Sequence, residues 1–160
     1  MFEFTNLQNA LNEYADVFIE RYQQNLDDKD ANASGTLRNT ITSNVLVDDL
    51  HYEVTLNLQG YYKFVQNGAG PGAFIPTDKL LEWINIRRIL PRDGQTLEQM
   101  ARSIQYSIFK NGSKGFREHR ENVFNNTLDE LKTEYETKIQ EALYTDIVDH
   151  IDELIEKYIF

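Results

Sequence analysis

The chain has 160 residues, no cysteine and a formal net charge of −10, and this length is typical of one domain with one hydrophobic core. The lack of cysteine excludes disulfides and thiolate metal sites. The acidic charge argues against a general nucleic-acid binder, because neutralising phosphates requires clustered Lys and Arg. The charge is also uneven, since residues 121–160 hold 11 acidic and 3 basic side chains, a net charge of −8.

The N-terminal segment begins MFEFTNLQNA and has no basic region followed by an apolar run. No stretch approaches the roughly 18 apolar residues of a membrane span, so we expect a protein that is neither secreted nor membrane-spanning. Thr5 and Gln8 have the spacing of a capping box. Apolar residues then recur at helical spacing and predict an amphipathic helix over 6–26: Leu7, Leu11, Tyr14, Phe18, Tyr22 and Leu26.

Residues 36–59 alternate between apolar and polar side chains, which predicts a two-stranded antiparallel hairpin with one buried face. The apolar positions are odd in the first strand and even in the second: Leu37, Ile41, Val45 and Val47, then Tyr52, Val54, Leu56 and Leu58. The Asp-rich stretch 47–50 predicts the turn between them. After Gly60, the spacing of Tyr61, Phe64 and Val65 predicts a short helix that Asn67-Gly68 ends.

The segment GAGPGAF at 68–74 resembles a phosphate-binding loop only in its glycine content. Its spacing matches neither common phosphate motif, and no Lys follows. We therefore interpret it as a turn with glycines at positive φ and with Pro71 fixing its neighbour.

Two further helices follow this loop. Thr77 is the predicted N-cap of a short helix that ends near Arg88 and places Leu80, Leu81, Ile84 and Trp83 in or near the core. Pro91–Gly94 reads as a turn. Thr96 and Gln99 then form a second capping box that opens a helix ending at Asn111-Gly112. Its apolar face comprises Leu97, Met100, Ala101, Ile104 and Ile108.

From Glu121 onward the sequence predicts one long acidic helix with a continuous apolar stripe. The stripe comprises Phe124, Leu128, Leu131, Tyr135, Ile139, Leu143, Ile147, Ile151, Leu154 and Tyr158. A helix of this length extends about 55 Å, more than the diameter of a small domain, so part of it must project or pack on another chain. The average step of about 3.8 residues exceeds the 3.5 of a regular left-handed coiled coil.

Several short patterns occur in the order found in one viral family. They are Ser34-Gly35 with Leu37-Arg38, then Tyr62 with Phe64-Val65, the GAGPG of 68–72, Pro76, and Glu82-Trp83-Ile84. Together, over residues 5–118, the chain resembles the tail-completion or neck proteins of tailed bacteriophages, of the lambda-like joining type. This resemblance implies a structural virion protein made in the host cytoplasm. Copies of it would form a ring that joins the portal or connector to the tail.

The resemblance favours an interface role for the glycine loop, at Gly68, Gly70, Pro71 and Gly72. A basic group lies at Lys110, Lys114, Arg117, His119 and Arg120, with Arg87, Arg88 and Arg92 earlier. These residues are surface charges near helix ends, or they dock an acidic partner such as the last helix of a neighbouring copy. DNA passing through the ring lumen is a third interpretation. On that last helix, the hypothetical interface comprises Leu131, Tyr135, Ile139, Leu143, Ile147 and Ile151.

No catalytic, cofactor or metal site is predicted, and we do not expect an enzyme. His51, His119 and His150 lack a metal-ligand spacing, and no nucleophile motif such as GxSxG is present. Asp146 and His150 stand at i and i+4, which we interpret as the solvated face of an acidic helix.

The predicted fold class is α+β. A small antiparallel hairpin sheet is covered by the helices at 6–26 and 96–110, in a neck-like domain over 1–120, and the acidic amphipathic helix occupies 121–160. We predict that deleting 125–160 leaves a folded core that cannot assemble into the particle. The alternative function is a monomeric binding or assembly-chaperone module that uses the C-terminal helix to fill a groove.

Overall fold

The computed structural model is α+β and mostly helical, and it describes residues 3–29, 35–48, 51–60, 62–92, 94–114 and 122–159. The elements are α1 (Thr5–Asp28), α2 (Thr36–Asn39), β1 (Thr42–Val47), β2 (Tyr52–Asn57), α3 (Tyr62–Asn67), α4 (Thr77–Ile86), α5 (Leu97–Asn111) and α7 (Val123–Ile159). They form two compact units, whereas the length of the chain predicted one domain with a single hydrophobic core. The first unit gathers α1 up to Gln24, the hairpin, and α7 from Asn125 onward; the second gathers residues 25–40 and 58–124.

The hairpin has the predicted antiparallel pairing. Val45 lies opposite Val54 and Ser43 opposite Leu56, so odd positions of β1 and even positions of β2 share a face. The turn depends on Asp48, whose side chain accepts a hydrogen bond from the His51 amide at 2.8 Å, as expected for a turn Asp.

The first strand is shorter than predicted, because its first half is the single helical turn α2. Leu37 is buried in that turn. Gly35 precedes the turn with φ 76°, a left-handed conformation that glycine adopts without a steric penalty. The Asn39 amide donates to the Gly35 carbonyl at 2.9 Å, which closes the turn. Alternation of apolar residues alone did not distinguish this turn from a strand.

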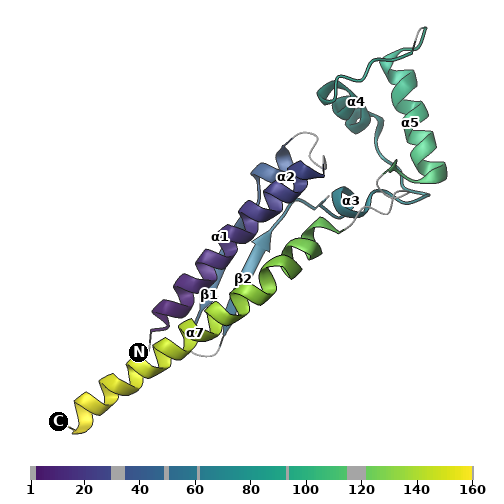
Figure 1. Ribbon diagram of the computed structural model, residues 1–160. Coiled ribbons are helices and arrows are strands. Elements are labelled where there is room, and N and C mark those ends of the chain that lie inside the picture. The colour runs from purple at the N-terminus through teal and green to yellow at the C-terminus, as the bar shows by residue number, and fades with distance from the viewer. Residues whose placement is uncertain are drawn as a thin grey trace. The chain divides into compact units, whose positions relative to one another are not determined.

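In the first unit, α1 and α7 lie side by side along the hairpin (Figure 1). The buried side chains of α1 follow the predicted stripe through Leu7, Leu11, Phe18 and Tyr22, with Ala15 between them. On α7 the buried residues include Thr127, Leu131 and Tyr135. A chain that ends before residue 125 would lose these buried residues of the first unit, and the folding of the truncated chain stays a prediction.

In the second unit, α4 and α5 pack through Leu80, Ile84, Met100 and Ala101, with Ile104 and Ile108 partly buried against them. The prediction that the 96–110 helix covers the sheet is corrected here, because the buried face of α5 packs on α4. Trp83 is 37% exposed and Leu97 39% exposed, so neither belongs to the core that the spacing predicted.

The ends of these helices confirm one predicted cap and correct another. At α5, the Thr96 side chain accepts from the Gln99 amide and the Gln99 side chain accepts from the Thr96 amide, which completes the capping box. At α4, the N-cap is Pro76 and no side chain caps the helix, so the Thr77 prediction is wrong by one residue. The C-terminus of α4 places Arg88 at φ 51°.

Candidate protein-interaction surfaces

The start of α1 is capped by a side chain 140 positions away in the sequence. Helix α1 begins at Thr5, and the Gln8 amide donates to the Phe4 carbonyl, so the predicted Thr5 cap is wrong. Instead, the buried Asp146 of α7 accepts from the Asn6 amide at 3.0 Å, the Asn6 side chain at 2.8 Å and the Leu7 amide at 2.8 Å. A carboxylate at this end also suits the helix dipole.

The i, i+4 spacing suggested that Asp146 and His150 share a solvated face. This interpretation is wrong for Asp146, which is buried. Both of its carboxylate oxygens hold α1 against α7. Among the described residues, no group of three His, Cys, Asp or Glu side chains is placed to bind a metal ion.

Polar contacts show that α1 and α7 run antiparallel. Glu13 lies 3.2 Å from both the Tyr135 hydroxyl and the Lys138 ammonium, and Arg21 lies 3.6 Å from Glu130. Hydrogen bonds from Lys138 and Tyr135 lower the pKa of Glu13, while burial and the Glu13 hydrogen bond raise the pKa of Tyr135. These contacts fix the register of the two helices.

The residues predicted as an interface along α7 divide into three groups. Leu131 and Tyr135 are buried, and the Tyr135 ring lies 5.3 Å from that of Tyr14, so these two residues belong to the intrachain core and leave the interface hypothesis. Ile139 and Leu143 are half-buried. Ile147 and Ile151 are exposed by 42% and 49%, and they remain candidates for contact with another chain.

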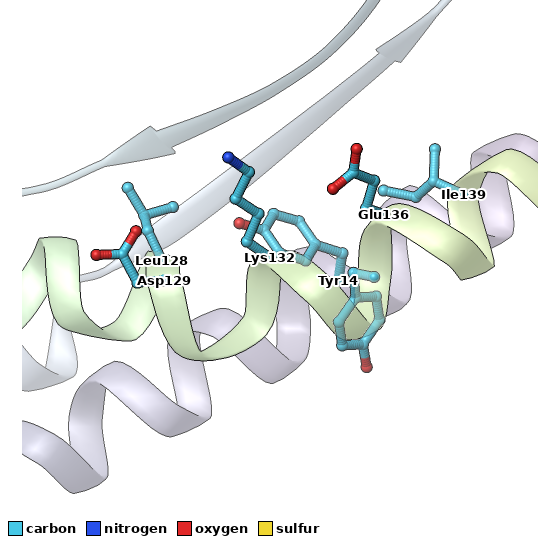
Figure 2. A pocket seen from close by; sticks show the side chains of 7 residues that line it. Tyr14, Leu128, Asp129, Lys132, Glu136 and Ile139 are labelled. Atoms are coloured by element: carbon cyan, nitrogen blue, oxygen red, sulfur yellow. The ribbon is translucent and has the colours of Figure 1, made fainter.

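An open groove of about 470 Å³ lies where α1 meets the first half of α7. It is lined by Tyr14, Leu128, Asp129, Lys132, Tyr135, Glu136 and Ile139. Figure 2 shows Leu128, Lys132, Glu136 and Ile139 rising from the same side of α7. The lining is chiefly apolar, with one ammonium and two carboxylate groups, and its chemistry suits an apolar side chain flanked by charge.

The glycine loop is held by hydrogen bonds within its own unit. The Ala69 amide donates to Ser113 Oγ at 2.9 Å, and the Ser113 amide donates to the Ala69 carbonyl at 2.7 Å. The Gly72 amide donates to the Phe109 carbonyl at 2.7 Å, where Gly72 has φ 84°. The Ala69 and Gly72 amides therefore already have protein acceptors, while Pro71 and Gly72 face solvent.

Exposed aromatic side chains accompany this loop. Gln105 donates from its side chain to the Ile75 carbonyl at 2.6 Å, so the loop runs beside the last two turns of α5. Phe74 on the loop, and Tyr106 and Phe109 on α5, are 72%, 66% and 50% exposed. We call these three residues the aromatic patch. Sequence reasoning missed the patch, although Tyr106 and Phe109 lie outside the apolar face predicted for this helix.

Of the basic group, Lys110, Lys114, Arg88 and Arg92 are exposed and Arg87 is half-buried. Arg117, His119 and Arg120 lie outside the described residues, so the predicted meeting of this group with an acidic helix stays a prediction.

None of the helices in the described ranges is both long and apolar enough to cross a bilayer. Comparisons with protein-family models, with curated proteins and with solved structures found no match.

Proposed function

We propose that this chain is a structural protein of the head-to-tail junction of a tailed bacteriophage. Copies of it would form a ring that joins the portal or connector to the tail. The sequence resemblance supports the viral setting. The observation that carries the interaction role is the aromatic patch beside the GAGPG loop, within the segment that bears the resemblance.

The physical argument is one of exposure. Aromatic side chains are enriched in protein interfaces and contribute much of their binding energy, whereas monomeric proteins rarely expose large apolar patches. Phe74, Tyr106 and Phe109 lie around a loop whose backbone is fixed by hydrogen bonds to Phe109 and Ser113. A fixed loop loses little conformational entropy when it binds, which favours contact with a partner subunit.

Complementation of a phage that lacks this gene tests the proposal. Phe109→Asp would place a charge in the aromatic patch, and Ser107→Asp is the matched control on an exposed position of the same helix. We expect Phe109→Asp to yield a folded protein by circular dichroism, with heads and tails that accumulate separately. Ser107→Asp should give complete particles.

Mass spectrometry of purified particles provides the second measurement. The chain should be present in complete virions and at the neck by antibody labelling. Its absence from virions, or full joining by a folded Phe109→Asp protein, would overturn the proposal. Function as a monomeric assembly chaperone predicts the first of these results, because a chaperone does not remain in the particle.

A further inference from the structure

The last turns of α7 carry a heptad pattern that follows the four-residue steps from Leu131 through Tyr135 and Ile139 to Leu143. Tyr144, Ile147, Ile151, Leu154 and Tyr158 follow one another at steps of 3, 4, 3 and 4 residues, which are the a and d positions of a coiled coil. All five are exposed, by 70%, 42%, 49%, 41% and 74%. We call Tyr144–Tyr158 the C-terminal heptads.

The apolar side of the C-terminal heptads faces away from the side that packs on α1. At 3.6 residues per turn, each residue advances about 100° around the helix. Measured from the buried Leu131, the five heptad residues point within about 40° of the opposite direction. They therefore lie opposite the α1-facing core residues.

Charge is segregated in the same way. The acidic residues of this segment are Asp146, Asp149, Asp152, Glu153 and Glu156, and all of them point within about 60° of the Leu131 direction. A partner that packs on the apolar side would meet none of these carboxylates at its centre. The positions that flank the seam are Val148, Ile155, His150 and Lys157.

From this arrangement we propose that the C-terminal heptads pair in parallel with the same segment of a second copy. A parallel pair places His150 beside Ile155 of the second copy, since g positions face e positions. An antiparallel pair would instead place His150 beside Lys157 of the second copy, which sets one basic side chain against another. This inference rests on the proposed ring, in which the C-terminal heptads would be the segment through which copies meet.

Pairing is favoured because the helix is already formed. An isolated helix of this length is marginal in water, since nucleation is costly. Here the C-terminal heptads continue a helix whose first half is packed in the first unit through Leu131 and Tyr135. Exposed apolar residues on a fixed helix can then bury one another without a folding cost, and Ile155 widens the apolar side enough for bundles of more than two helices.

Cysteine cross-linking tests the pairing in the full chain, which has no cysteine of its own. Ile151→Cys places a thiol at an a position, and Glu156→Cys places one on the acidic side as the matched control. Under mild oxidation, Ile151→Cys should form a covalent dimer much faster than Glu156→Cys. Equal rates for the two variants would overturn the proposal.

Light scattering with size-exclusion chromatography provides a second measurement. The unmodified chain should exceed the monomer mass, in a concentration-dependent way. Ile151→Asp should raise the dissociation constant at least about tenfold, because the seam would bury a charge, while Thr145→Asp, exposed outside the seam, should not. A monomeric parent chain would refute this pairing, and particle mass spectrometry would still decide the proposed junction role independently.

Discussion

Replacing Asp146 by Asn tests whether one side chain of α7 holds the start of α1. Oδ1 accepts from the Asn6 amide and side chain, and Oδ2 accepts from the Leu7 amide. An Asn side chain retains only one acceptor oxygen. Whichever way the new side-chain amide points, its NH2 group faces at least one N–H group of α1, and that N–H group loses its acceptor.

The expected loss follows from two contributions. A buried N–H group without an acceptor costs about 1–3 kcal/mol, and the Leu7 amide is buried. Removing a carboxylate from a helix N-terminus costs about 0.3–1 kcal/mol more. We therefore expect Asp146→Asn to lower the free energy of unfolding by about 2–3 kcal/mol.

Urea unfolding followed by circular dichroism measures this loss, with the slope of each transition checked for two-state behaviour. Asp149→Asn is the matched control, because Asp149 is exposed on the same helix and its replacement should change stability by no more than about 0.5 kcal/mol. In Asp146→Asn, the amides of Asn6 and Leu7 should also exchange hydrogen faster. If the two variants unfold within about 0.5 kcal/mol of each other, the cap contributes nothing.

Three smaller predictions address single contacts. Arg88→Gly should raise the free energy of unfolding by up to about 1 kcal/mol, because a non-glycine residue at φ 51° is strained, whereas Arg87→Gly, at an ordinary helical φ, should lower it. Thr96→Ala should cost about 1 kcal/mol through loss of the capping box. Glu13→Gln should destabilise the protein at neutral pH. The folded pKa of Glu13 lies below its ordinary 4.5. The difference in free energy of unfolding between Glu13→Gln and the parent chain should therefore be full above pH 4.5 and should vanish as the pH falls through the folded pKa. Urea unfolding measures all three predictions, and for Glu13→Gln it is repeated across pH.

Local patterns were predicted best from the sequence. The stripe of α1, the hairpin register, the Asp48 turn and the Thr96 capping box each depend on residues within a few positions of one another, so propensity and spacing are sufficient. Trp83 shows the limit, because spacing places a side chain on a helix face without saying what covers that face. The Asp146 cap shows the same limit over a longer distance. No local rule connects position 146 with positions 6 and 7, and only the antiparallel packing of α1 and α7 brings them together.

The predicted stripe of α7 failed for a geometric reason. From Leu131 to Ile151 the apolar residues recur every four positions, and four residues advance about 400° around a helix, or 40° beyond a full turn. Five such steps rotate the stripe by about 200°, so it begins on the α1 side and ends on the opposite side. The sequence therefore encodes two apolar surfaces in series, one buried at Leu131 and Tyr135 and one exposed at Ile147 and Ile151. A helix that served only the fold would not need the second surface, and its change to heptad steps from Tyr144 suits pairing with another copy.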